Sequence, residues 1–173
     1  MNLLVQDKQR YAKCKEMPRF LKYFRKYQDA NNRILKQLYR ILYRFFAKKS
    51  CIEIPRDTKI GGGLYIGHPF CITINGKATL GLNCNIHKGV TIGQENRGLR
   101  KGAPQIGNDV WIGINATVVG GIKIGDDVLI APNTFVNCDI PSHSVVFGNP
   151  CIIRHRDNAT ENYINRKCEY VDS

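Results

Sequence analysis

The sequence predicts an all-β solenoid, a coil of short stacked strands, preceded by a small α-helical region. Three observations support this: an aliphatic residue returns at every sixth position from Ile54, a small or apolar residue follows most of these four places later, and residues 1–50 lack the repeat but carry most of the net charge. A period of six fits neither an isolated amphipathic helix nor an alternating strand. It fits stacked repeats, because one repeat cannot bury its aliphatic face alone.

The six-residue repeat runs in three blocks. Its aliphatic residues are Ile54, Ile60, Ile66 and Ile72, then, after a shift of two, Ile74, Leu80, Ile86 and Ile92, and, after a gap, Ile106, Ile112, Val118, Ile124, Ile130 and Val136. The residues four places later are Leu64, Phe70, Ala78, Cys84, Val90, Val110, Ala116, Ile122, Val128, Thr134 and Ile140. Glycine often follows the aliphatic residue, as in Ile60-Gly61, and suits the tight corners of a coil.

The gap between Ile92 and Ile106 holds a polar, basic segment, QENRGLRKGAPQ. An excursion from a regular solenoid is a typical place for function. We therefore expect Arg97, Arg100 and Lys101 to contact a substrate.

The first fifty residues read as helical and basic, with 14 Lys and Arg against 3 Asp and Glu. Pro18 suits the first turn of a helix that runs to about Tyr27, and Asn32 is a candidate cap for the next one. In that second helix, apolar residues fall at three- and four-residue spacings between basic ones, which predicts an amphipathic helix. The region either docks on the repeats or on another subunit, or lies on anionic lipid. No nucleic-acid motif accompanies the charge.

Composition excludes some classes of protein. No stretch approaches the about 18 consecutive apolar residues of a membrane span, and the first residues lack the apolar run of a signal peptide. We expect a cytoplasmic protein, with the inner face of the membrane as an alternative location. The seven cysteines, Cys14 among them, form no C-x-x-C pair, so we read them as reduced and structural.

The segments IGNDVWIGINATVVGGIKIGDDVLIAPNTFV and IPSHSVVFGNPCII resemble the last coils of bacterial hexapeptide-repeat acyltransferases. Within that family the chain is most similar to serine acetyltransferase and its relatives in capsule and exopolysaccharide gene clusters. The resemblance covers residues 51–153, which leaves a helical region (1–50) and a short tail (154–173). It implies a left-handed parallel β-helix with three repeats per coil, a homotrimer with active sites between subunits, and acetyl-CoA as acyl donor with no metal.

The resemblance also implies catalytic residues. Acetyl transfer to an alcohol needs a base, because an alcohol is a poor nucleophile at neutral pH, and a histidine is well suited to accept the proton. His68 occupies the place of the family's catalytic histidine, and Glu53 falls where serine acetyltransferase has the aspartate that pairs with it. His87 comes 19 residues after His68, so it is a second candidate on a stacked coil, as base or as acceptor ligand. We take His143 as structural and assign nothing to His155.

By position in the family, Gly93, Gly113, Ile114 and Ala131 are expected to line the pantetheine channel of the donor. Their lack of polar side chains would leave backbone groups for the pantetheine amides, and the Gly93 N–H is a candidate oxyanion donor. Trp111 and Asn115 are expected to border the same groove.

The family pattern fails at three positions that bear on the acceptor. Where serine acetyltransferase has an aspartate before its catalytic histidine and an Arg-His pair in its loop, this chain has Gly67, Gly102 and Ala103. An amino-acid acceptor needs charged partners that are mostly missing here. We therefore favour a hydroxyl of a saccharide or glycan precursor, with serine as the alternative. Rival classes are a non-catalytic trimeric scaffold and a zinc enzyme resembling γ-class carbonic anhydrases, which needs three converging histidines.

Overall fold

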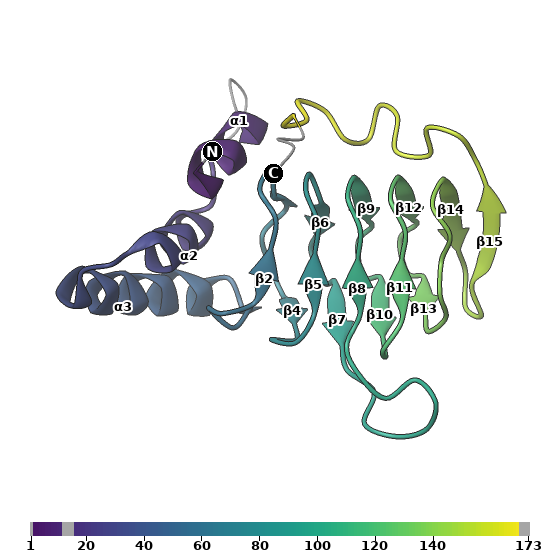
Figure 1. Cartoon of the computed structure of the whole chain (residues 1–173), viewed down its shortest axis with the longest axis horizontal. Coiled ribbons are helices and arrows are strands. Elements are labelled where there is room, and N and C mark those ends of the chain that lie inside the picture. The colour runs from purple at the N-terminus through teal and green to yellow at the C-terminus, as the bar shows by residue number, and fades with distance from the viewer. Residues whose placement is uncertain (1, 12–15, 170–173) are drawn as a thin grey trace.

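The computed structural model describes residues 2–11 and 16–169 and shows three helices followed by a prism of stacked strands (Figure 1). The helices are α1 (Leu3–Tyr11), α2 (Arg19–Asp29) and α3 (Arg33–Lys49). Cys14 lies outside the described residues.

The strands form three sheets, which are the three faces of the prism. The first sheet contains β1 (Ile52–Glu53), β4 (Ile72–Ile74), β7 (Thr91–Gly93), β10 (Thr117–Val119) and β13 (Phe135–Val136), and the second contains β2 (Lys59–Ile60), β5 (Thr79–Leu80), β8 (Gln105–Ile106) and β11 (Lys123–Ile124). The third sheet contains β3 (Tyr65–Gly67), β6 (Asn85–His87), β9 (Val110–Ile112), β12 (Val128–Ile130), β14 (Ser144–Phe147) and β15 (Ile152–His155). Only the last pair, β14 and β15, is antiparallel among these strand pairs of the described chain.

Strand register confirms the six-residue repeat. Val110 pairs with Val128, an offset of 18 residues, which is three repeats per coil. Ile52 pairs with Ile72, an offset of 20, because the first coil contains two extra residues. On β4 both Ile72 and Ile74 are buried, and this is where the sequence pattern shifts by two.

The solenoid core consists of the predicted inward positions. Every six-spaced aliphatic residue from Ile54 to Val136 is buried. Phe70 is the exception among the residues four places later, with 52% of its surface exposed. It lies in the lengthened corner between β3 and β4, where His68 and Cys71 have left-handed backbone conformations (φ 55° and 52°). That corner breaks the simple alternation and turns Phe70 outward.

The helical region is anchored on the first coil. Arg25 of α2 donates hydrogen bonds to the carbonyls of Ile60 and Gly61, and Asp7 of α1 accepts one from the amide of Leu64. Asn32 caps α3, since its Oδ1 accepts from the amides of Ile34 and Leu35. Among the described helices, none combines the length and the apolar character that crossing a bilayer requires.

Two irregular segments complete the molecule. The segment between β7 and β8 projects from the prism as a hairpin closed by paired backbone hydrogen bonds of Glu95 and Gly102 (Figure 1). After β15, residues 156–169 run back along the third sheet to α1 (Figure 1). Asp127 holds this segment, because its carboxylate accepts hydrogen bonds from the amides of Ala159 and Thr160 and from the Thr160 hydroxyl.

Candidate functional site

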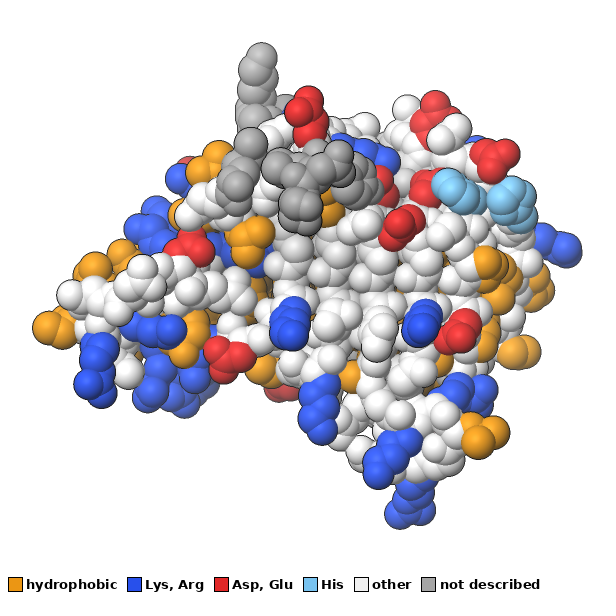
Figure 2. Space-filling view, viewed as in Figure 1, with side chains coloured by type: hydrophobic (Ala, Val, Ile, Leu, Met, Phe, Trp, Pro, Cys, Tyr) orange, Lys and Arg blue, Asp and Glu red, His pale blue; other side chains and the backbone are white. Residues whose placement is uncertain are grey.

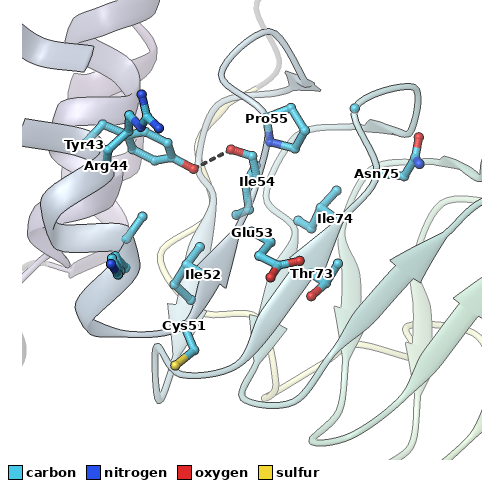
Figure 3. Close-up of a pocket in the computed structure, with 13 residues that line it drawn as sticks. Tyr43, Arg44, Cys51, Ile52, Glu53, Ile54, Pro55, Thr73, Ile74 and Asn75 are labelled. Atoms are coloured by element: carbon cyan, nitrogen blue, oxygen red, sulfur yellow. Dashed lines mark hydrogen bonds between the residues drawn. The ribbon is translucent and has the colours of Figure 1, made fainter. Parts of the chain in front are cut away.

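A groove of about 840 Å³ lies between α3 and the first sheet (Figure 3). Its lining residues are Tyr43, Arg44, Ala47, Lys48, Cys51, Ile52, Glu53, Ile54, Pro55, Thr73, Ile74, Asn75 and Gly76. Glu53 is exposed and pairs in register with Thr73 on the neighbouring strand. Arg44 and Lys48 supply positive charge from the helix side. The groove therefore combines an apolar wall with a carboxylate and two cations.

Tyr43 holds the helix side of the groove in place. Its ring is buried, and its hydroxyl donates a hydrogen bond to the carbonyl of Ile54 (Figure 3). Burial raises the pKa of Tyr43 to about 12, so the hydroxyl keeps its proton at neutral pH. The sequence pattern does not single out Tyr43, which is buried on α3 together with Ala47.

His68 lies at the corner that follows β3, between the third and the first sheet, with its side chain exposed. In the described part of the chain, no hydrogen bond or ion pair joins His68 to Glu53, which lies on β1 of the first sheet. The dyad of His68 and Glu53 remains a prediction.

The corner of His68 is one edge of the prism, and the later coils continue it. Backbone hydrogen bonds stack the coils along this edge, from Gly89 N to Phe70 O (3.1 Å), from Asn115 N to Lys88 O (3.0 Å) and from Asn133 N to Ile114 O (2.9 Å). His68 therefore lies on the same edge as Gly113, Ile114 and Ala131, which are expected to line the donor channel, and as Asn115, which is expected to border it.

Gly113 allows the coils to approach closely on this edge. A Cβ added to Gly113 would lie 2.6 Å from the backbone nitrogen of Pro132, so no side chain fits there. The amides of Gly113 and Ala131 donate to the carbonyls of Ile130 and Val146 (both 2.8 Å). These two N–H groups already donate hydrogen bonds within the solenoid. A ligand bound along this edge would therefore have to hydrogen-bond to other backbone groups.

Gly93 and the loop lie elsewhere. Gly93 ends β7 on the first sheet and leads into the projecting hairpin. Arg97, Arg100 and Lys101 are all exposed on that hairpin, and Leu99 at its tip is fully exposed. Figure 2 shows Lys and Arg side chains gathered on this loop and over the helical region. The structure separates these residues from the edge of His68 within one chain.

His87 lies on β6 directly beside the residue that precedes His68. Gly67 and His87 are register partners, and a Cβ added to Gly67 would lie 2.6 Å from Cδ2 and 2.7 Å from Nε2 of His87. His87 Nδ1 is 3.0 Å from the carbonyl oxygen of Ile112. Because a carbonyl only accepts, Nδ1 of His87 is the donor in this contact. The geometry therefore brings the two candidate histidines to neighbouring positions.

Trp111 packs on His87, with ring centroids 4.6 Å apart, and does not lie on the edge of Gly113. Together with Tyr163 of the C-terminal segment, Trp111 and His87 line a small pocket of about 210 Å³. The sequence does not predict the position of Tyr163, because the tail after β15 has no periodic pattern.

The remaining predicted residues have structural contacts. His143 Nδ1 is 2.9 Å from Asp127 Oδ2, next to the C-terminal segment. The six described cysteines are free thiols, and the Sγ atoms of Cys138 and Cys151 are 3.8 Å apart. Among the described residues, no cluster of His, Cys, Asp and Glu has a geometry that could hold a metal ion.

Comparison with known proteins identifies the repeats. Residues 103–138 match the family model for bacterial transferase hexapeptide (six repeats). The serine acetyltransferase of Staphylococcus aureus (strain Mu50 / ATCC 700699) is 40% identical over 114 residues, which are 66% of this chain and 52% of that protein. The chain thus spans about half the length of this relative.

Solved structures agree with the fold. The crystal structure of Neisseria gonorrhoeae serine acetyltransferase in complex with serine has a TM-score of 0.65 and 28% identity, and the match covers 88% of this chain and 66% of that one. A serine acetyltransferase complex with CoA shares the fold with a TM-score of 0.65 and 24% identity, over 78% of this chain and 55% of that one. The predicted fold, a left-handed parallel β-helix after N-terminal helices, is confirmed. The chain carries bacterial transferase hexapeptide repeats and is similar in sequence and in fold to serine acetyltransferases.

Proposed function

We propose that the protein is an acetyl-CoA-dependent O-acetyltransferase and that its acceptor is serine. The sequence alone favours a saccharide, but the Staphylococcus aureus relative and the Neisseria gonorrhoeae structure are serine acetyltransferases, and the latter is solved with serine bound. One observation carries the proposal. The exposed imidazole of His68 lies on the same edge of the prism as Gly113, Ile114 and Ala131. The CoA complex of a protein with this fold supports the choice of donor.

The proposed reaction is direct transfer in a ternary complex. The imidazole of His68 accepts the proton of the acceptor hydroxyl as its oxygen attacks the thioester carbon. When the carbon–sulfur bond breaks, the departing thiolate takes that proton from the imidazolium. His87, which lies one coil away beside Gly67, would contact the acceptor and is the alternative base.

A homotrimer would complete this site. Within one chain and among the described residues, no hydrogen bond or ion pair joins His68 to Glu53, and the cationic hairpin follows β7 whereas His68 follows β3. We infer that the hairpin of a neighbouring subunit supplies Arg97, Arg100 and Lys101 to the site. These cations would bind the serine carboxylate or the phosphates of CoA, both of which arginine recognises well.

The test is release of free CoA thiol by purified protein given acetyl-CoA and either serine, simple sugars or nucleotide-sugars. We expect serine to be the best acceptor. His68→Ala should lower kcat by about a hundredfold or more, whereas the matched control His155→Ala, an exposed histidine on β15, should not. A His68→Ala enzyme with full activity, together with an inactive His87→Ala enzyme, would move the base to His87. No acetyl transfer to any acceptor would favour a non-catalytic scaffold.

A saccharide acceptor remains the second candidate because of Gly67. The ring of His87 occupies the space that a side chain at position 67 would need. The aspartate that the resemblance implies for serine acetyltransferase at this place would therefore not fit here. The site thereby lacks one partner for an ammonium group. Faster transfer to a sugar hydroxyl than to serine in the same screen would establish this alternative.

A further inference from the structure

Helix α3 has two apolar faces, and only one of them is covered. Tyr43 and Ala47 are buried against the rest of the protein, and Phe46 stacks on Tyr23 of α2 with ring centroids 5.5 Å apart. The opposite side, here called the outer face, consists of Ile34, Leu35, Leu38, Ile41 and Phe45, which are 79%, 45%, 46%, 63% and 53% exposed. Helical spacing places these residues on one continuous stripe.

Such a stripe needs an apolar partner. Single exposed apolar residues are ordinary, but a contiguous row of five on one helix marks an interaction surface. Helix α3 lies at the end of the molecule opposite β15 (Figure 1), where Figure 2 shows apolar and basic side chains intermingled.

The charge of α3 restricts the chemistry of that partner. The helix carries six basic residues, Arg33, Lys36, Arg40, Arg44, Lys48 and Lys49, and no acidic residue. Lys49 Nζ lies 4.5 Å from the centroid of the Phe45 ring, so a cation flanks the apolar stripe directly. A second copy of α3 laid on this face would bring cations against cations, whereas an anionic surface would be attracted.

Four basic residues of α1 and α2 make contacts within the protein. Arg10 and Arg25 are buried, and both donate to backbone carbonyls of the first coil. Lys22 and Lys26 lie over the rings of Tyr23 and Tyr39. These contacts hold four basic residues of α1 and α2 within the helical region, whereas α3 carries basic residues beside an exposed apolar stripe.

We propose that the outer face of α3 binds the surface of an anionic lipid membrane. The apolar stripe enters the boundary between headgroups and acyl chains, and the flanking Lys and Arg meet the phosphates of anionic lipids. Helix α3 lies in the plane of the interface, and the coils extend away from it. This inference does not depend on the acceptor.

The experiment is co-sedimentation of the full-length protein with vesicles of phosphatidylcholine alone or mixed with phosphatidylserine. We expect binding to the mixed vesicles, weaker binding to phosphatidylcholine alone, and a loss of binding at high salt. The double variant Ile34→Gln/Ile41→Gln should bind about tenfold more weakly or worse, because it removes two inserted side chains. Arg33→Gln/Lys49→Gln should also weaken binding and should reduce its dependence on salt.

Matched controls separate a membrane surface from general effects. Ile152→Gln removes an exposed isoleucine at the far end of the solenoid, and Lys59→Gln/Lys77→Gln removes two exposed cations on the coils. Both controls should bind like the unchanged protein. Absence of binding to the mixed vesicles, or equal binding by Ile34→Gln/Ile41→Gln, would overturn the proposal. A different result would assign the outer face to a second copy of the chain. The unchanged protein would then bind no vesicles, and Ile34→Gln/Ile41→Gln would change the sedimentation velocity of the lipid-free protein.

The same variants keep this proposal distinct from the proposed function. Ile34 and Ile41 do not line the groove of Glu53, so Ile34→Gln/Ile41→Gln should retain acetyl transfer in solution. Loss of vesicle binding with retained activity supports the membrane surface, whereas an inactive but vesicle-binding protein would contradict only the catalytic proposal.

Discussion

Asp7 and Arg25 form an ion pair that solvent does not reach, with 2.7 Å between Asp7 Oδ2 and Arg25 Nε and no exposed surface on either side chain. The pair joins α1 to α2, and both side chains also form hydrogen bonds with backbone groups of the first coil. A buried ion pair survives desolvation only when its remaining donors and acceptors are also satisfied. Here the carbonyls of Ile60 and Gly61 and the amide of Leu64 supply those partners.

Asp7→Asn should therefore be strongly destabilising. The substitution leaves the guanidinium of Arg25 buried without a counter-charge, which typically costs about 3 to 5 kcal/mol. Urea denaturation followed by circular dichroism measures the change in the free energy of unfolding. Asp57→Asn, at an exposed position, is the control and should change that free energy by less than about 0.5 kcal/mol. Equal effects of the two substitutions would contradict the buried pair.

Asp127 should make stability depend on pH in the acid range. Burial alone would raise the pKa of Asp127, but hydrogen bonds from Thr160, His143 and Ala159 outweigh it and hold the pKa below its ordinary value of 3.8. The folded state therefore prefers the carboxylate. This contribution is present above the ordinary pKa and is lost as the pH falls through the lowered value.

Asp127→Asn should lower the free energy of unfolding at neutral pH by about 1 to 3 kcal/mol, because donors of the C-terminal segment lose an ionised acceptor. The difference between this variant and the unchanged protein should shrink as the pH drops below the ordinary pKa. Thermal unfolding at a series of pH values measures it. A difference that stays constant down to the acid limit would show that Asp127 does not act through its charge.

Gly67→Ala should be destabilising through His87. The added methyl group would lie 2.6 Å from Cδ2 of His87, whose ring is held by Ile112 and Trp111. We expect a cost of about 1 to 3 kcal/mol, as for other insertions into packed sites. In the background of His87→Ala the same substitution should cost much less, so a double-mutant cycle by thermal unfolding should reveal coupling. Additive effects would contradict the contact.

Asn32→Ala should weaken the start of α3. Its Oδ1 accepts from two amides of the first turn, and loss of such a cap costs about 1 kcal/mol. Asn31→Ala, at the exposed neighbouring position, is a matched control. Circular dichroism under increasing urea compares the two. A larger effect at Asn31 than at Asn32 would contradict the assignment of the cap.

The solenoid could be predicted because its repeat maps directly onto geometry. Each six-spaced aliphatic residue faces the core, so counting along the chain identified the interior of the prism. Phe70 does not follow this rule, because the first coil contains two extra residues. The corner that holds them includes residues with left-handed backbone conformations, which the repeat does not predict.

The site was predicted less completely, for a physical reason. His68, Gly113 and Ala131 stack on one edge because each follows a strand of the same sheet, and the repeat length predicts that. Tyr163 reaches Trp111 from a tail without periodicity, and Asp7 meets Arg25 only after two helices have packed. Contacts of this kind depend on tertiary packing, which spacing along the chain does not encode.

The C-terminal segment changes how the solenoid can come apart. An open array of repeats loses its units one at a time from an end, because each unit contacts only its neighbours. Here Arg10 Nε donates to Asn165 O (2.8 Å), and Cys168 donates from its amide to Asn83 Oδ1 (2.8 Å) and from Sγ to Gln6 O (3.3 Å). The C-terminal segment that leaves the last coil is thus hydrogen-bonded to α1 and to Asn83 of the second coil, so unfolding from either end of the solenoid must first break these bonds.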